Sequence, residues 1–132
     1  MENRIIKFRG KNIHTGEWLY GDYHREGKTH YITKPEQYLR EYAPIEFIVD
    51  GKTVGQYTGL LDKNGKEIYE GDVILQQGYS GKKPMLVRFE HGAFIVGWHG
   101  GSSTATRPML IQKRCEVLGN IHDNPSLISD KQ

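Results

Sequence analysis

The sequence contains one cysteine among its 132 residues, Cys115. A single thiol cannot form an intrachain disulfide, and it cannot provide the several thiolates of a cysteine-based zinc site. The fold must therefore be held by packing and hydrogen bonds, as expected for a protein in a reducing, cytoplasmic environment. Because Cys115 lies near the start of a predicted strand, we interpret it as a small buried hydrophobic residue.

Long hydrophobic runs are also missing. The first residues, MENRIIKFRGK, are interrupted by charge every few positions. No later apolar run approaches the roughly 18 residues that a membrane-spanning helix requires. We therefore expect a soluble protein without a secretion signal and without a membrane partner.

Catalytic and phosphate-binding motifs are absent as well. The chain has no GxSxG nucleophile motif, and its Gly/Ser-rich loop, His99 to Pro108, lacks the GxxxxGK[ST] spacing of a phosphate-binding loop. Glu70 and Asp72 flank a glycine in what we interpret as an ordinary entry from a turn into a strand, not as an acid/base pair. We therefore predict no catalytic residue and no cofactor.

Glycine is plentiful in this chain, with 16 residues, and hydrophobic residues make up 36 %. Burial must then come from short alternating strands joined by tight turns, so we predict a mainly β protein with at most one short helix. The length suits one domain or two small lobes sharing a core. We expect a β-rich N-terminal part over residues 1–55, a hairpin plus a small barrel over 56–128 packed with it as one unit, and a frayed tail over 129–132.

The N-terminal part shows several short strand patterns. Strands are predicted over Ile5–Phe8 and Glu17–Tyr23, a hairpin continues around Gly27, and a further strand is predicted over Ile45–Val49. Thr33 and Glu36 have capping-box spacing, which predicts a short helix over Pro35–Tyr42.

The segment QYTGLLDKNGKEIYEGDVI, residues 56–74, carries four carboxylates. Its DKNG turn has two hairpin interpretations, and a type I turn that starts at Asp62 with Gly65 as a left-handed bulge residue avoids like-charge pairs by placing Asp62 opposite Lys66. A calcium loop is disfavoured, because Lys66 would occupy a ligand position. We therefore interpret these carboxylates as scaffolding and predict no metal ligand.

The segment MLVRFEHGAFIVGW predicts the clearest hairpin. A two-residue turn at His91-Gly92 pairs Phe89 with Phe94, Val87 with Val96 and Met85 with Trp98. One face is then wholly apolar, and we assign all six of these residues to the core. Together with strands over Glu70–Gln77, Met109–Gln112 and Glu116–Ile121, this hairpin predicts a small SH3-like β-barrel in the C-terminal half.

One group of side chains has metal-ligand character, namely Asp22, His24, Glu26 and His30. Strand alternation places the first three on one face, but His30 joins them only across a three-residue loop and lies on the opposite face across either two-residue loop. An exposed polar strand face is the alternative to a zinc site.

Positive charge gathers between Gln76 and Cys115, where six basic residues face Glu90 alone, a net charge of +5. Such a lobe is a candidate nucleic-acid surface, although a solvated rim is the common alternative. Because the large aromatic residues are assigned to the core, we predict at most weak binding without sequence selectivity. The candidate nucleic-acid-binding residues are Lys82, Lys83, Arg107, Lys113 and Arg114.

Four segments together resemble the YopX family of phage and prophage proteins. They are IKFRGK, GEWLYGD, TVGQYTGLLDKNGKEIYEGDVI and EVLGNIHDNPSL, and they span nearly the whole chain. The resemblance implies a phage or prophage origin, a bacterial cytoplasmic location and a mainly β fold with an SH3-like barrel. It implies no activity, so no site residue can be carried over.

Three functional hypotheses remain. The first is a non-catalytic binding or assembly module whose partner is another protein or a second copy of the chain. The second is a protein that associates weakly with nucleic acid through the basic lobe. The third is a metal-dependent enzyme that uses His24, Glu26 and His30.

Overall fold

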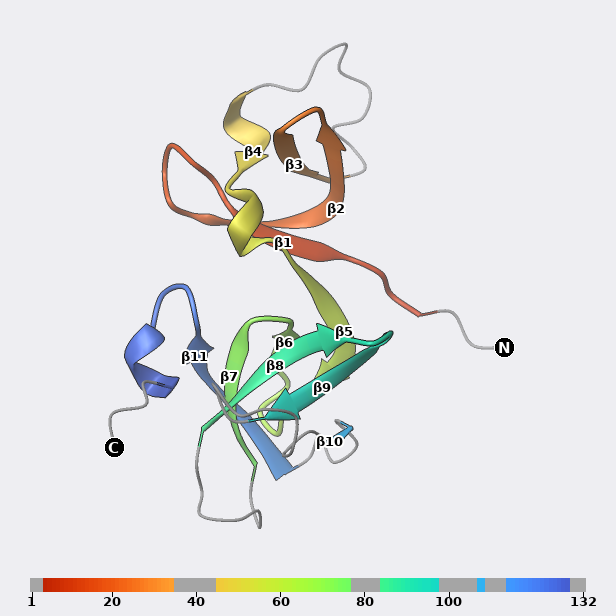
Figure 1. The fold of residues 1–132 in the computed structure, drawn as a ribbon, viewed down its shortest axis with the longest axis vertical. Helices are drawn as coiled ribbons and strands as arrows, with labels where there is room; N and C mark the ends of the chain where they lie inside the picture. Colours follow the sequence, from red (N-terminus) through yellow and green to blue (C-terminus); the bar gives the residue numbers. More distant parts are fainter. Residues whose placement is uncertain (1–3, 35–44, 77–83, 98–106, 109–113, 129–132) are drawn as a thin grey trace. The chain divides into compact units, whose positions relative to one another are not determined.

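The computed structural model describes residues 4–34, 45–76, 84–97, 107–108 and 114–128 (Figure 1). All regular structure in these residues is antiparallel strand or short 3₁₀ helix, which confirms the predicted mainly β class. The helix predicted over Pro35–Tyr42 and the strand predicted over Met109–Gln112 lie outside the described residues. Among the described residues, no helix is long and apolar enough to cross a membrane.

The chain divides into two compact units, Met1–Tyr57 and Thr58–Gln132. A six-stranded sheet has the order β4-β3-β2-β1-β5-β6, and its strand β5 begins in the first unit and ends in the second. Its strands are β1 (Phe8–Lys11), β2 (Trp18–Glu26), β3 (Thr29–Thr33), β4 (Ile48–Val49), β5 (Gly55–Leu61) and β6 (Glu67–Tyr69). Two 3₁₀ helices, η2 (Ile45–Phe47) and η3 (Gly51–Thr53), flank β4.

In the first unit, β4 pairs with β3 and also meets the chain that follows β1. Asn12 forms a bridge with Val49, and the N–H of Ile13 donates to the carbonyl of Ile48 at 3.1 Å. Val49 of β4 and Ile32 of β3 are both buried. The close approach requires glycine at position 10, because a Cβ there would lie 2.9 Å from a Val49 methyl group.

Two predicted strands of this unit are corrected. The first strand begins at Phe8 and not at Ile5, because its pairing with β2 starts at Phe8 and Gly21. Ile5 and Ile6 have strand propensity but lie outside the ladder. The strand predicted over Ile45–Val49 is a 3₁₀ turn in its first three residues and extended only at its end.

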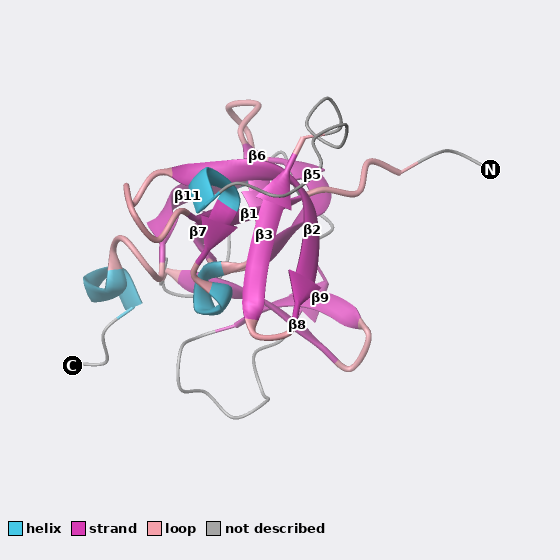
Figure 2. Ribbon diagram, turned by 90° about the horizontal axis from the view of Figure 1, so that it is seen from above, coloured by secondary structure: helices cyan, strands magenta, loops and turns pink. Residues whose placement is uncertain are grey.

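The second unit contains a five-stranded sheet with the order β10-β9-β8-β7-β11. Figure 2 shows its strands in magenta. They are β7 (Asp72–Gln76), β8 (Met85–Glu90), β9 (Ala93–Gly97), β10 (Arg107–Pro108) and β11 (Cys115–Asn120), and a 3₁₀ helix, η6 (Pro125–Ile128), follows. The strand pairing of the described residues does not close this sheet into a barrel.

The hairpin of β8 and β9 has the predicted register. His91 and Gly92 both have positive φ, +52° and +82°, as a two-residue type I′ turn requires, and Val87 pairs with Val96. Trp98, the predicted partner of Met85, lies outside the described residues. The apolar face of the hairpin enters a core cluster made of Ile68, Ile74, Met85, Val87, Val96 and Cys115.

Burial at the end of this hairpin differs from the prediction. Phe89 pairs with Phe94 as expected, but Phe89 is 46 % exposed and Phe94 is only half-buried. Alternation correctly assigns both rings to the face that carries Val87. Alternation does not show how far the core extends along that face. The assignment of Phe89 to the core is therefore wrong.

Candidate functional site

Phe89 is the most exposed large hydrophobic side chain in the described residues of the second unit, and it lies in the hairpin tip, which we define as residues 88–94. The rings of Phe89 and Phe94 lie edge to face on one side of the tip, with their centroids 4.9 Å apart. On the other side, Arg88 Nε lies 3.3 Å from Glu90 Oε2 in an ion pair. The tip therefore presents an aromatic pair on one face and a locally neutralised charge pair on the other.

The backbone of β8 extends beyond its neighbour β7 at this tip. Their paired residues end at Val73 opposite Leu86, and beyond them the N–H of Gly71 donates to the carbonyl of Val87 at 2.9 Å. In a hairpin closed by a two-residue turn, alternate residues direct their backbone groups away from the partner strand. Phe89 shares this orientation with Val87, so its N–H and carbonyl face the side on which β7 has already ended.

His91 occupies the left-handed region of backbone conformation at the tip. For a residue with a Cβ this conformation costs roughly 1–2 kcal/mol, and Asn or Gly adopts it more readily. His91 is exposed. An imidazole is therefore displayed here where asparagine would form the same turn at lower cost.

The predicted turn at Asp62 is confirmed. The N–H of Asp62 donates to the carbonyl of Lys66 at 2.7 Å, the N–H of Gly65 donates to the carbonyl of Asp62 at 3.0 Å, and Gly65 has φ of +83°. These are the bonds of a type I turn followed by a left-handed bulge residue.

The Asp62 carboxylate accepts three backbone hydrogen bonds. Oδ1 accepts from the N–H of Asn64 at 2.8 Å and of Lys66 at 2.9 Å, and Oδ2 accepts from the N–H of Val117 at 2.9 Å. Burial by itself would raise the pKa of Asp62, but these bonds and the charge of Lys66 together bring the pKa below its ordinary value. The carboxylate holds the turn and ties it to β11, which is a scaffolding role.

Asp72 also serves the backbone. It is almost completely buried, and its Oδ2 accepts a hydrogen bond from the N–H of Tyr69 at 2.7 Å across the turn that contains Gly71. This matches the interpretation of Glu70 to Asp72 as an entry from a turn into a strand.

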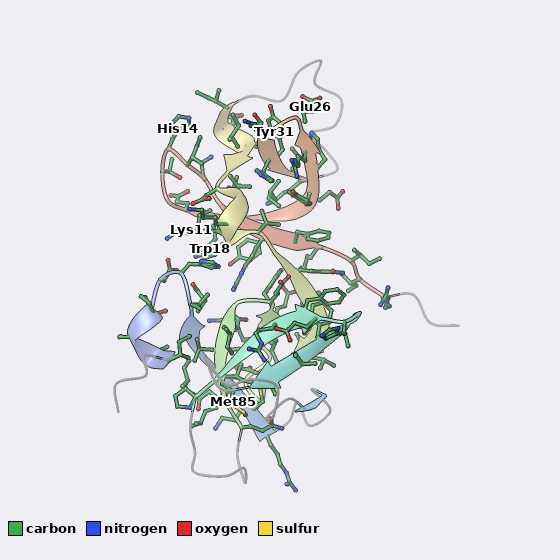
Figure 3. All side chains as sticks on the ribbon, in the orientation of Figure 1. Lys11, His14, Trp18, Glu26, Tyr31 and Met85 are labelled. Atoms are coloured by element: carbon green, nitrogen blue, oxygen red, sulfur yellow. The ribbon has the colours of Figure 1, made fainter. Side chains whose placement is uncertain are left out.

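The side chains proposed as zinc ligands lie on two faces of the β2–β3 hairpin. Its two-residue turn, Gly27-Lys28, places His30 opposite Arg25 and separates it from His24 and Glu26. The His30 ring instead meets Tyr23, whose hydroxyl lies 2.8 Å from Nδ1, while the His24 ring stacks on Tyr31. Figure 3 labels Glu26 and Tyr31 on this hairpin.

Across the described ranges, no three His, Cys, Asp or Glu side chains gather as metal ligands would. Because His30 lies on the face opposite His24 and Glu26, the three residues named in the metal-dependent enzyme hypothesis do not form a ligand set.

Of the candidate nucleic-acid-binding residues, Lys82, Lys83 and Lys113 lie outside the described residues. Arg107 begins β10, and Arg114 is exposed directly before β11. The register places the start of β10 beside the end of β9, and the start of β11 beside Gln76 at the end of β7. Both arginines therefore belong to the same end of the five-stranded sheet.

The aromatic tip belongs to the opposite end of that sheet. Strand β8 runs from Met85 at the arginine end to Glu90 at the tip. Four residue steps separate Met85 from Phe89, which is about 13 Å along a strand. Surface charges reach about 8–10 Å in physiological salt. A nucleic-acid surface requires aromatic rings that stack on bases to alternate with basic residues that neutralise phosphates. The exposed ring of Phe89 and the two arginines lie too far apart to form such a surface.

A cation–π arrangement in the first unit was not anticipated from the sequence. The guanidinium carbon of Arg9 lies 4.6 Å from the ring centroid of Trp18, and Lys11 Nζ lies 5.7 Å from it. Figure 3 shows Lys11 and Trp18 next to each other. The sequence could have indicated this arrangement, because residues 9 and 11 share one strand face. Arg9 is only 5 % exposed, so this arrangement is structural.

Known proteins resemble this chain both in sequence and in fold. A family model described as YopX protein matches residues 7–129. The crystal structure of protein EF1440 from Enterococcus faecalis superposes with a TM-score of 0.53 and 24 % sequence identity, over 96 % of this chain and 100 % of that one. At this identity the likeness shows a shared fold. None of the curated proteins matches this chain.

Proposed function

This chain belongs to the YopX family, and we propose that it is a non-catalytic binding or assembly module that contacts another protein through its hairpin tip. The observation that carries this proposal is the exposed Phe89 ring, packed edge to face against Phe94. We further propose that the strands of the second unit complete an SH3-like barrel. This barrel packs with the N-terminal part as one unit. The protein acts in the cytoplasm of a bacterium that carries the phage or prophage.

The chemistry of the tip favours a protein partner. Aromatic side chains are enriched at protein interfaces, where they bury a large area at a small cost in conformational entropy. The ion pair between Arg88 and Glu90 leaves the tip with little net charge, which does not favour a polyanion. The two-residue turn and the strand pairing hold the backbone that carries both rings, so we expect binding to require little backbone ordering.

Co-purification of partners with matched variants tests this proposal. The wild-type chain, Phe89→Asp and Leu118→Asp are expressed in a bacterial host of the prophage and purified under mild conditions. Leu118 is the control, because it is 38 % exposed on β11 of the same sheet. We expect Phe89→Asp to lose at least 90 % of the co-purifying protein or self-assembly and Leu118→Asp to retain it. Equal retention by both variants would overturn the proposal.

A weaker second candidate is association with nucleic acid at the opposite end of the sheet. The observation that favours it is the placement of Arg107 and Arg114 at one sheet end, with Lys82, Lys83 and Lys113 in the adjoining sequence. Because no exposed aromatic side chain accompanies the two arginines at that end of the described sheet, we expect Kd values in the non-specific range of roughly 10⁻⁴ to 10⁻⁶ M that weaken steeply with salt. Fluorescence anisotropy with labelled oligonucleotides at two salt concentrations tests this. Tight, sequence-selective binding that survives high salt would make the basic end the functional site.

A further inference from the structure

The segment that precedes β1 exposes two consecutive apolar side chains. We call residues Arg4–Lys7 the arm. Ile5 is 64 % exposed and Ile6 is 54 % exposed, and Figure 1 shows the arm leaving β1 as an extended stretch. Consecutive residues of an extended chain point to opposite sides. The exposure of both isoleucines means that neither side of the arm is covered.

A backbone hydrogen bond ties the arm to its own unit at the last residue of the arm, Lys7. The carbonyl of Lys7 accepts a hydrogen bond from the N–H of Tyr57 at 2.8 Å, which continues the pairing of β1 with β5 by one step. Residues 4–6 are not part of any strand. The β-branched isoleucines nevertheless favour a strand, so residues 4–6 have the composition of a strand although they belong to none.

The edge of β8 at Phe89 could pair with such a segment. Beyond the end of β7, the N–H and carbonyl of Phe89 face outward. We propose that the arm of a second copy of this chain adds to this edge as an antiparallel strand. In the register that we infer, Ile5 lies opposite Phe89 and Arg4 lies opposite Glu90. Alternation then places the isoleucine beside the exposed ring on one face and the arginine beside the carboxylate on the other.

Charge order selects this register and direction. Arg4 precedes Ile5, and Glu90 follows Phe89. An antiparallel pair therefore places Arg4 opposite Glu90, Ile5 opposite Phe89 and Ile6 opposite Arg88, whereas a parallel pair would place Arg4 opposite Arg88. Glu90 is 43 % exposed at its side chain, so it can accept Arg4 in addition to Arg88.

The occupant that we propose is a second copy, because the order of charged and apolar residues in the arm matches that of the edge. Ile5 is the most exposed of the large apolar residues in the described part of the chain, so it has apolar surface to bury. Docking of the chain's own arm is the alternative that the test below separates. The contact joins two different surfaces, so each copy still offers one arm and one edge. Such heterologous contacts build rings or open chains of copies. This inference rests on the proposed function and names the partner of the hairpin tip.

Disulfide trapping between two different variants tests the register. A chain with Ile5→Cys is mixed with a chain with Phe89→Cys, each also carrying Cys115→Ala, in a glutathione redox buffer. Residues in a hydrogen-bonded antiparallel pair have Cα atoms about 5.5 Å apart, within the range that a disulfide spans. We expect a mixed disulfide dimer to form in at least tenfold excess over the same mixture made with Ile13→Cys, a control residue that is 53 % exposed.

Three results would overturn the inference. They are the absence of a mixed dimer, equal trapping with Ile13→Cys, and an intrachain disulfide in a monomer when one chain carries both cysteines. Charge reversal gives a second measurement without cysteines. In sedimentation velocity, Arg4→Glu and Glu90→Arg should each weaken self-association by about 1.5- to 5-fold, and a chain with both changes should recover it. Failure to recover would contradict the register.

These outcomes separate the inference from the proposed function. If trapping fails while Phe89→Asp still abolishes co-purification, the hairpin tip binds a different protein and only the second-copy inference is wrong. If Phe89→Asp leaves all association intact, both are wrong.

Discussion

The Asp62 carboxylate accepts a hydrogen bond from the backbone N–H of Val117, 55 residues further along the chain, at 2.9 Å. The N–H of Lys63 donates to the carbonyl of Cys115 at 2.9 Å beside it. These two bonds hold the turn after β5 against β11. One side chain therefore forms its own turn and also joins two segments that are distant in sequence.

Replacing Asp62 should destabilise the protein measurably. Asp62→Ala leaves three backbone N–H groups without their charged acceptor. Because hydrogen bonds to charged groups contribute about 1.5–3 kcal/mol and solvent can reach part of the turn, we expect a loss of about 2–3 kcal/mol in the free energy of unfolding. Urea denaturation measures this. As a control, Lys63→Ala removes only the exposed ion pair with Glu116 and should cost less than about 1 kcal/mol.

The lowered pKa of Asp62 predicts how stability depends on pH. Above the ordinary carboxyl pKa of about 4, the group is ionised in both states and its stabilisation is fully present. As pH falls through the lowered pKa of the folded state, the unfolded state binds the proton more readily and this stabilisation is lost. Asp62→Asn should flatten the decline in stability below about pH 4. An unchanged pH profile in that variant would contradict the assignment.

Two residues on the same face of β8 should respond very differently to truncation. Met85 is 1 % exposed, so Met85→Ala should lower the free energy of unfolding by about 2–5 kcal/mol. Phe89 is 46 % exposed, so Phe89→Ala should cost less than about 1 kcal/mol. Thermal or urea unfolding of both variants provides the comparison. A core-sized loss for Phe89→Ala would show that the ring is packed and not displayed.

The turn at the hairpin tip should tolerate a stabilising change. His91→Asn places the residue preferred in a type I′ turn at a position with φ of +52°. We expect a gain of up to about 1 kcal/mol in the free energy of unfolding, because asparagine adopts this conformation at lower cost. Denaturation of the purified variant measures the gain. A loss of stability would indicate that the imidazole makes contacts that hold the turn.

The thiol of Cys115 should be inert in the native protein. Burial, and to a smaller extent the nearby carboxylates Asp62, Asp72 and Glu116, raises its pKa to about 11, so little thiolate forms at pH 8. We expect negligible reaction with a disulfide reagent at that pH and one equivalent of reaction after unfolding in urea. Rapid native labelling would contradict the buried position.

Local patterns predicted the features that depend on neighbouring residues. The His91-Gly92 turn and strict alternation were sufficient to predict that Val87 pairs with Val96. Charge pairing across the DKNG turn was sufficient for the role of Asp62 in its own loop. In both cases the interacting residues lie within about ten positions of each other, where turn geometry restricts the choices.

Features that depend on distant segments could not be predicted. The bond from Val117 to Asp62 requires knowing which strand lies beside the turn. The exposure of Phe89 depends on where β7 ends relative to β8, which alternation along β8 does not contain. For the same reason, the sequence alone predicted that Phe89 lies in the core and did not predict the hairpin tip as a contact site.

The central claim, that the hairpin tip contacts a protein, is tested most directly by photocrosslinking at position 89. The photoreactive amino acid p-benzoylphenylalanine replaces Phe89 in one variant and Leu118 in a control, and both are irradiated in cells of the prophage host. We predict a discrete crosslinked species of higher mass from position 89 and none from position 118. No adduct at position 89, or the same adduct at both positions, would contradict the claim.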